Sequence, residues 1–191
     1  DKPLVVSFWG SLGAAHMNEQ MVNFIRAELF AGSPFHHIHA AGAAGYSKMQ
    51  EALRDAGVDL AGTDVDLREY IYDMPTVMRA ADLVISRGGA STISELTALG
   101  MPSIIVPSPY VVNNHQEKNA RVLEEAGGIC LMLESESSGK ALYNAAMEIL
   151  GDSTKREGMR KAMLSLSVAD ATERIYHTVM ALAPKAEKTE I

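Results

Sequence analysis

The stretch that decides the fold lies near the middle of the chain and reads Ser86-Arg87-Gly88-Gly89-Ala90-Ser91-Thr92-Ile93-Ser94-Glu95. The apolar run before it, 80–85, is typical of a short strand buried in a parallel sheet. The residues after it, 93–99, have a helical pattern that Gly100 and Pro102 end. The stretch is therefore predicted to form a strand, a tight glycine turn and the start of a helix.

The turn has the composition of a binding site for an anion. Gly88 and Gly89 are expected to adopt positive φ and to let a ligand approach the backbone. Ser91 and Thr92 are expected to cap the helix, whose free N–H groups and positive dipole end favour phosphate or hydroxyl ligands. Glu95 could accept two hydrogen bonds from a ribose diol. The alternative interpretation is a capped helix after a strand, with no ligand.

Strands and helices alternate on both sides of this stretch. Strands are predicted at 4–9, 35–40, 65–71, 83–86, 103–107 and 129–133. Helices are predicted at 15–29, 47–56, after Asp73, at 93–99, 116–126, 140–150, 154–166 and 171–182. This order is typical of an α/β fold, a doubly wound parallel sheet of about six strands with helices on both faces. Right-handed crossovers bring the strand-to-helix turns to one edge, where we expect the ligand crevice.

Composition limits the classes of function. The chain has 191 residues, of which 47% are hydrophobic, enough for one or at most two compact domains with a core. We expect one main unit at 1–184 and a charged tail at 185–191. The formal net charge of −7 argues against nucleic acid as a partner. It also implies that a phosphate would be held mainly by backbone N–H groups and one or two local cations.

Two other segments at the predicted edge have polar or glycine-rich sequences. The turn 10–14, Gly-Ser-Leu-Gly-Ala, could hold a phosphate, but it lacks the G-x-G-x-x-G spacing of dinucleotide sites, and we predict no cofactor. Trp9 beside it could wall the crevice or simply pack in the core. The segment 113–120 offers amides and an imidazole at a helix start, which suit sugar hydroxyls. Its alternative is a surface helix capped by Asn114.

Candidate metal ligands are interpreted as structural. Asp64 and Asp66 match a D-x-D pattern, but they precede a strand rather than a binding turn. His37 and His39 share one strand face, but no cysteine or carboxylate follows nearby to complete a metal site. His16 could reach a phosphate or lie on a helix surface. No nucleophile–base arrangement is visible, so neither a metal nor a catalytic residue is predicted.

Four segments taken together resemble the MurG family of peptidoglycan glycosyltransferases, which add N-acetylglucosamine to lipid I. They are Gly10-Ser11-Leu12-Gly13-Ala14, Tyr70-Ile71-Tyr72-Asp73-Met74, the stretch 86–95, and Asn114-His115-Gln116-Glu117-Lys118-Asn119-Ala120. The resemblance covers nearly the whole chain, but only as the C-terminal, Rossmann-like donor-binding half of the two-domain GT-B fold. It implies that the N-terminal acceptor domain is absent from this chain. In the family a C-terminal helix reaches back to that domain, so the placement of the last helix here, 171–182, stays open between loose and repacked.

The resemblance implies a set of residues that bind a UDP-sugar: Ser11, Gly13, Ile71, Arg87, Gly89, Ala90, Ser91, Thr92, Glu95, Asn114, His115, Gln116 and Asn119. The backbone of Ile71 would contact uracil, and Glu95 would bind the ribose. Residues 90–92 would contact the diphosphate. His115 and Gln116 would bind the sugar hydroxyls, with Asn119 orienting them.

Three positions depart from the family pattern, and all lie on the phosphate side. Trp9 stands in place of a glycine, Ala15 in place of an arginine, and Ala41 in place of a serine or threonine. Either backbone N–H groups suffice for the phosphates, or His16 and Arg87 compensate.

The implied reaction moves N-acetylglucosamine from UDP-N-acetylglucosamine to lipid I without a bound metal. In the family, the acceptor site, the membrane-facing patch and the general base belong to the N-terminal domain. The whole protein would thus be cytoplasmic and peripheral on the inner face of the plasma membrane, and this chain alone would bind donor without turnover. Two alternatives stay open: the donor half of another GT-B lipid glycosyltransferase, and a non-catalytic nucleotide-sugar-binding module.

Overall fold

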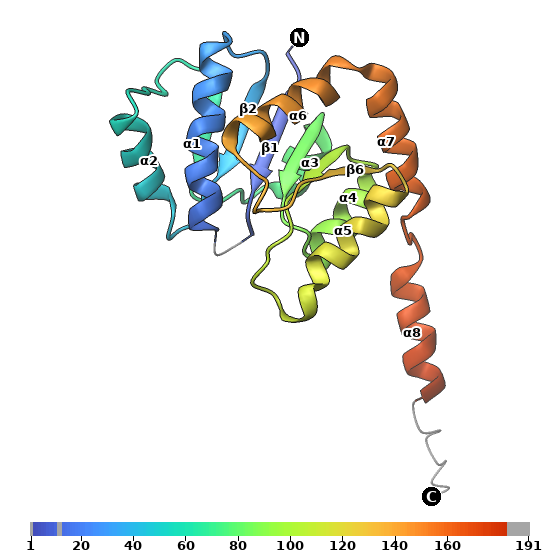
Figure 1. Ribbon diagram of the computed structural model, residues 1–191. Helices are drawn as coiled ribbons and strands as arrows, with labels where there is room; N and C mark the ends of the chain where they lie inside the picture. The colour runs from blue at the N-terminus through green and yellow to red at the C-terminus, as the bar shows by residue number, and fades with distance from the viewer. Residues whose placement is uncertain (1, 11–12, 183–191) are drawn as a thin grey trace, which may run out of the picture.

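The computed structural model describes residues 2–10 and 13–182, which form a six-stranded parallel sheet covered by helices on both faces (Figure 1). The strand order is β3-β2-β1-β4-β5-β6. The strands are β1 (Leu4–Phe8), β2 (His36–Ala40), β3 (Val65–Arg68), β4 (Leu83–Ser86), β5 (Ser103–Ile105) and β6 (Ile129–Leu131). The predicted doubly wound α/β fold is confirmed.

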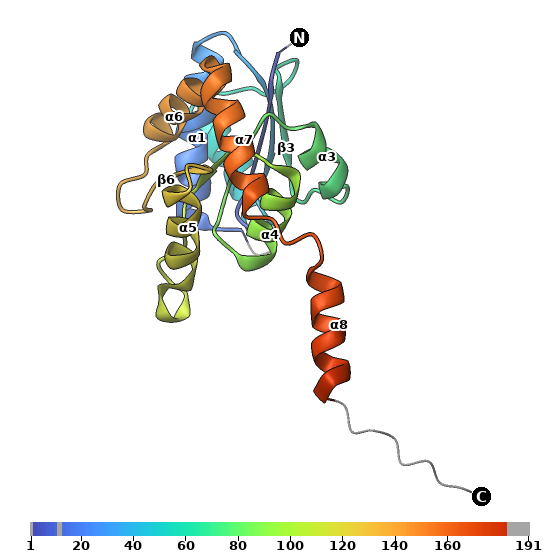
Figure 2. The same cartoon turned by 90° about the vertical axis from the view of Figure 1, so that its right-hand side faces the viewer.

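The helices follow the strands in the predicted alternation. They are α1 (Ala15–Phe30), α2 (Tyr46–Asp55), α3 (Met74–Ala80), α4 (Ala90–Leu99), α5 (His115–Glu125), α6 (Gly139–Gly151), α7 (Ser153–Ser165) and α8 (Ala171–Leu182), with a 3₁₀ turn η1 (Val112–Asn114) before α5. Helices α1 and α6 lie on one face of the sheet, and α3 and α4 on the other (Figure 2). Among the described helices, none combines the length and the apolar character needed to cross a membrane.

Two apolar layers hold the sheet between these helices, because successive strand residues point to opposite faces. Val5 packs with Phe24 of α1 and Leu142 of α6, whereas Val6 packs with Leu96 of α4 on the other side. All five side chains are completely buried. Burial of each stabilises the fold by about 1.5–3 kcal/mol, so this sandwich fixes the position of both helix layers.

The sheet changes its winding direction between β1 and β4. These two strands are adjacent and parallel, and their last residues, Phe8 and Ser86, lie opposite each other. The helix after β1 covers one face, and the helix after β4 covers the other. The two connections therefore diverge and leave a crevice at the carboxyl ends of β1 and β4, the usual ligand position in open α/β sheets.

The last helix stands apart from this body. α8 extends away from the sheet and its covering helices (Figures 1 and 2), and none of its residues is buried. Ile175, Val179 and Leu182 are 64%, 58% and 80% exposed, and their spacing puts them on one side of the helix. The helix predicted at 171–182 is confirmed, but it adds nothing to the core.

Candidate functional site

A cavity of about 740 Å³ lies where the sheet changes direction, at the predicted edge; we call it the switch-point cavity. It is lined by Phe8, Trp9, Gly10, Gly13, Ala14, Ala15, His16, Arg87, Gly89, Ser91, Thr92, Ser108, Tyr110, Gln116 and Glu134. Six of the predicted donor-binding residues are thus brought together: Gly13, Arg87, Gly89, Ser91, Thr92 and Gln116.

Two helix N-termini face this cavity without a capping side chain. Gly89 is the N-cap of α4 and Ala14 that of α1, and neither helix has an acidic residue in its first turn. In α4 the first intrahelical bond is donated by Ile93 N to Gly89 O, at 2.9 Å. The N–H groups of residues 90–92 therefore have no partner inside the helix, and both dipoles present their positive ends to the cavity. This arrangement suits an anion.

Two expectations about the central turn were wrong. Ser91 and Thr92 do not cap α4, because the helix begins at Ala90 and they lie in its first turn. Gly88 and Gly89 do not have positive φ; that of Gly89 is −67°. Gly88 is required for another reason: a Cβ there would lie 2.9 Å from the carbonyl oxygen of Gln116. The absent side chain lets α5 approach the turn.

The turn after β1 contains two glycines with positive φ, a conformation that other residues rarely adopt. Gly10 and Gly13 have φ of 87° and 71°, and a Cβ on Gly13 would lie 2.5 Å from the carbonyl oxygen of Ala41. That oxygen also accepts a hydrogen bond from Asn18 Nδ2, at 2.9 Å. The close contact joins the turn after β1 to the end of β2 and fixes where α1 begins. Ser11, also predicted as a donor contact, lies outside the described residues.

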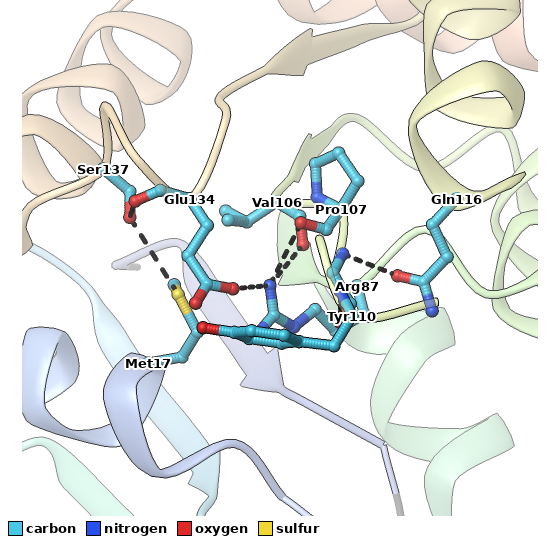
Figure 3. Close-up of polar contacts among 9 residues, drawn as sticks. Met17, Arg87, Val106, Pro107, Tyr110, Gln116, Glu134 and Ser137 are labelled. Atoms are coloured by element: carbon cyan, nitrogen blue, oxygen red, sulfur yellow. Dashed lines mark hydrogen bonds and ion pairs between the residues drawn. The ribbon is translucent and has the colours of Figure 1, made fainter. Parts of the chain in front are cut away.

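Arg87 is the main cation of the cavity, and it is already engaged (Figure 3). Its Nη1 donates to the carbonyl oxygens of Val106 and Pro107, at 3.1 and 3.2 Å. The same nitrogen lies 2.6 Å from Glu134 Oε2, and both side chains are about nine-tenths buried. Trp9 is buried too, and the guanidinium carbon of Arg87 lies 5.9 Å from its ring centroid. Trp9 thus both packs in the core and walls the cavity.

The loop before α5 has a defined polar structure. Gln116 Oε1 accepts a hydrogen bond from Ser108 N at 2.9 Å, which holds the loop over the cavity (Figure 3). Asn114 is the N-cap residue, as expected, but its side chain donates to Glu117 Oε2 rather than capping the helix. Its left-handed φ of 51° bends the chain into α5. His115 is exposed, and its Nδ1 lies 3.0 Å from the carbonyl oxygen of Val112.

The remaining predicted residues do not line the switch-point cavity. Ala90 and Asn119 line a groove of about 640 Å³ between α4 and α5. Glu95 is exposed on α4, and it has no ion pair or hydrogen bond with another described side chain. Ile71 is buried beyond the end of β3, and its N–H and C=O bond to no other described backbone group. Both groups keep the hydrogen-bonding capacity that a base edge requires.

Glu134 and Tyr110 are cavity residues that the sequence analysis missed. Glu134 follows β6 and Tyr110 lies in the loop after β5, so both occupy turns at the carboxyl edge of the sheet. Because every strand-to-helix turn of such a sheet meets at that edge, the order of elements alone could have included them.

The candidate metal ligands are otherwise occupied. Asp64 lies at the amino end of β3, away from the cavity, and pairs with Lys2 and His36, at 2.6 and 2.9 Å. His37 and His39 share a strand face as predicted, but a carboxylate does lie near them in space: Glu28 Oε2 is 2.8 Å from His37 Nδ1. Ser7 Oγ bridges the two rings, at 2.8 and 2.6 Å. Within residues 2–10 and 13–182, no group of three or more His, Cys, Asp or Glu side chains is arranged so that it could hold a metal ion.

His37 and His39 form a row of two buried histidines, and the charge state of His39 follows from its burial. Burial, followed by the nearby His37, lowers the pKa of His39 to about 3, so its ring is neutral at ordinary pH. The row is fully buried beneath α1. Its hydrogen bonds join β1, β2 and α1.

A larger groove, of about 1,210 Å³, lies around the C-terminal end of α1 and the start of α6. The N-terminus of α6 lies in this groove, and its backbone N–H groups already have side-chain partners. Ser138 Oγ accepts a hydrogen bond from Ala141 N at 3.1 Å, and Gln20 Oε1 accepts from Gly139 N at 3.1 Å. The larger groove also contains cations, Arg26 and Lys140, but the switch-point cavity has two helix N-termini without capping side chains and is therefore the better anion site.

The sheet order and this cavity define a class of protein, the Rossmann-like α/β domains that bind ligands where the sheet changes direction. Residues 4–175 match the model of the glycosyltransferase family 28 C-terminal domain. The chain belongs to this family, and the resemblance to MurG is confirmed.

Curated relatives carry one enzyme name. A protein of Acetivibrio thermocellus called UDP-N-acetylglucosamine--N-acetylmuramyl-(pentapeptide) pyrophosphoryl-undecaprenol N-acetylglucosamine transferase is 41% identical over 94% of this chain and 47% of its own length. A Bacillus cereus protein of the same name, numbered 1, is 38% identical over 96% of this chain and 49% of its own length. The chain thus spans about half the length of these relatives.

Solved structures agree on the fold. MurG of Acinetobacter baumannii has a TM-score of 0.80 and is 22% identical, over 95% of this chain and 52% of that one. MnaA of S. aureus, solved with UDP, has a TM-score of 0.70 and is 16% identical, over 95% of this chain and 46% of that one.

Proposed function

We propose that residues 1–184 are the donor-binding half of an inverting glycosyltransferase that moves N-acetylglucosamine from UDP-N-acetylglucosamine to lipid-linked muramoyl-pentapeptide. The observation that carries the proposal is the convergence of two uncapped helix N-termini on one cavity at the switch point. The family match and the names of the relatives supply the donor and the acceptor. The tail predicted at 185–191 lies outside the described residues.

In this proposal the diphosphate lies against the first turn of α4. The free N–H groups of Ala90, Ser91 and Thr92, together with the helix dipole, oppose its negative charge. Charge grows on the UDP leaving group as the sugar bond breaks, so the same fixed groups stabilise the transition state more than the bound donor. Gly13 and Gly89 complete the backbone cradle, and Arg87 adds the local cation. The resemblance alone assigns Ser11 to the same set.

The nucleoside and the sugar extend from the diphosphate in opposite directions. Ile71 offers unpaired backbone groups to uracil, and Glu95 has a free, exposed carboxylate for the ribose hydroxyls. On the other side, His115 and Gln116 address the sugar, with Asn114 and Asn119 shaping the start of α5. Gln116 Oε1 is held by Ser108 N, which leaves its Nε2 to donate to a sugar hydroxyl.

We assign the acceptor site to the part of the relatives' sequences that this chain does not cover. The proposal assigns lipid I binding, the general base and contact with the membrane to that part. It makes the whole protein a peripheral enzyme on the inner face of the plasma membrane. The described residues contribute no membrane-spanning helix to that attachment.

Calorimetric titration of the folded chain with UDP tests the proposal. We expect saturable binding that UDP-N-acetylglucosamine displaces more effectively than UDP-glucose does. Equal displacement by both sugars would favour the donor half of a different lipid glycosyltransferase. Absence of heat with a folded sample at millimolar UDP would contradict nucleotide-sugar binding altogether.

A further inference from the structure

We infer that Glu134 is an affinity-limiting residue: its carboxylate pairs with Arg87 in the wall of the cavity and competes with the diphosphate of the donor for the guanidinium. The inference rests on the proposed function, because it concerns how tightly the same cavity binds a nucleoside diphosphate. It adds a positioning residue from the turn after β6, a segment that carries none of the predicted donor contacts.

The two side chains form an ion pair within the cavity wall. Arg87 Nη1 and Glu134 Oε2 are 2.6 Å apart, and the side chains are 11% and 8% exposed. Both residues line the cavity alongside Gly89, Ser91 and Thr92, whose segment offers the free helix N–H groups. A diphosphate bound at those groups therefore comes close to both charges.

The two charged groups are close, but their geometry is not that of a hydrogen bond. Glu134 Oε2 is buried, and within the described part of the chain it accepts no hydrogen bond of good geometry. Nη1 directs its N–H groups to the carbonyl oxygens of Val106 and Pro107 instead. A buried carboxylate that lacks hydrogen bonds is poorly compensated for lost water. Phosphate oxygens with better geometry can therefore replace it as the partner of Arg87.

The charged residues that line the cavity also indicate that Glu134 opposes phosphate binding. Among its described residues, Arg87 is the only permanent cation and Glu134 the only acid, with His16 as the other titratable group of the basic type. The carboxylate thus cancels the cation that would otherwise attract phosphate and repels the phosphate directly. Glu134 lowers the affinity for UDP and eases its departure after transfer, whereas uridine, which has no phosphate, is unaffected.

The test compares UDP and uridine binding by calorimetry in five forms of the chain: wild type, Glu134→Gln, Glu136→Gln, Arg87→Ala and Arg87→Ala/Glu134→Gln. Glu134→Gln keeps the side-chain volume and removes the charge, and we expect it to tighten UDP binding about tenfold, the value of one charge-assisted hydrogen bond. Its uridine affinity should equal that of the wild type. Glu136 is exposed and two residues away, so Glu136→Gln removes the same charge without the ion pair and should leave both affinities unchanged.

The double variant tests whether the effect passes through Arg87. Without the guanidinium, Glu134→Gln should bring much less than the tenfold gain. The inference is overturned if Glu134→Gln binds UDP no tighter than Glu136→Gln does, or if it tightens uridine equally. If Glu134→Gln does not fold, Glu134→Asp lengthens the ion pair and should shift UDP affinity in the same direction. A wild type that binds no UDP would overturn the proposed function as well, whereas normal wild-type binding without the gain overturns this inference alone.

Discussion

Gly88 illustrates how single residues place whole elements of this domain. A Cβ at this position would meet the carbonyl oxygen of Gln116 at 2.9 Å, whereas a Cβ on Gly89 would meet nothing closer than 3.9 Å. We predict that Gly88→Ala lowers the free energy of unfolding by about 1–3 kcal/mol, because backbone cannot yield as a flexible side chain can. Gly89→Ala is the matched control and should cost clearly less. Urea unfolding of both variants measures the difference, and equal losses would contradict the close-approach role of Gly88.

Glu95 tests the ribose end of the site. Its carboxylate is exposed and free of described partners, so its removal should not affect the fold. We predict that Glu95→Ala weakens the binding of both UDP and uridine by about 1–3 kcal/mol, because two ribose hydroxyls lose their acceptor. The free energy of unfolding should stay at the wild-type value. Unchanged uridine affinity in a folded variant would remove Glu95 from the site.

His39 makes stability depend on pH. The unfolded chain has a histidine with the ordinary pKa of 6.5, whereas burial lowers the pKa of folded His39 to about 3. Between these values the unfolded state binds the additional proton, so stability is complete above pH 6.5 and is lost as pH falls. From this residue alone we predict a free energy of unfolding about 1.4 kcal/mol lower at pH 5.5 than at pH 7.5.

Urea titrations of two variants at those pH values separate this contribution from others. His16 is on the surface of α1, and His16→Gln should keep the decrease. His39→Gln should lose most of it, even if the variant is less stable throughout. A decrease of the same size in His39→Gln would assign the pH dependence to other groups.

At this scale the sequence identified residue types better than it identified their roles. The glycines of the central turn were recognised, but their reason was not: Gly88 makes room for a helix 28 residues further on, a contact that no local pattern contains. The Glu28–His37 pair was missed for the same reason, since α1 and β2 meet only in the folded sheet. Glu134 was missed because a lone acidic residue after a short strand has no distinctive spacing.

The helices and strands themselves were largely predictable. Apolar runs bounded by glycine or proline gave all six strands, because parallel strands are buried on both faces. Boundaries were less accurate: the strand predicted at 65–71 ends at Arg68, and α4 begins at Ala90 rather than after Ser91 or Thr92. Helix caps depend on backbone angles, so Ser91 and Thr92, two and three positions after the N-cap residue Gly89, do not cap α4.

The terminal helix allows a prediction about stability. Because no residue of α8 is buried, we predict that deletion of 171–191 leaves the free energy of unfolding and the UDP affinity unchanged. Met163 of α7 is completely buried, so Met163→Ala should cost about 2–5 kcal/mol in the same assay. Marked destabilisation on deleting α8 would show that its apolar side packs on this body.

The whole molecule combines a complete α/β body with an unpartnered apolar helix. Ile175, Tyr176, Val179 and Met180 are all more than half exposed on α8. The chain also spans about half the length of its relatives. In the family a C-terminal helix reaches back to the other domain, and the proposal assigns the acceptor site to that domain as well. The parallel sheet with helices on both faces could be expected from the sequence, whereas the assignment of the acceptor site to another domain rests on the family resemblance.

We expect sugar transfer to require both this chain and the part of the relatives' sequences that it does not cover. We predict that the chain alone binds UDP but transfers no sugar to a lipid I analogue, because it lacks the proposed general base and acceptor site. A radiolabelled transfer assay measures this, with a full-length relative as the positive control. Turnover by the isolated chain would place the catalytic machinery in these residues.

The central claim is that the diphosphate of a uridine sugar binds between the N-termini of α1 and α4. A crystal structure of the chain with UDP tests it most directly. The account predicts phosphate oxygens within hydrogen-bonding distance of the N–H groups of residues 90–92, with the ribose at Glu95. Density for UDP in the groove between α1 and α6, or anywhere else away from the carboxyl ends of β1 and β4, would contradict it.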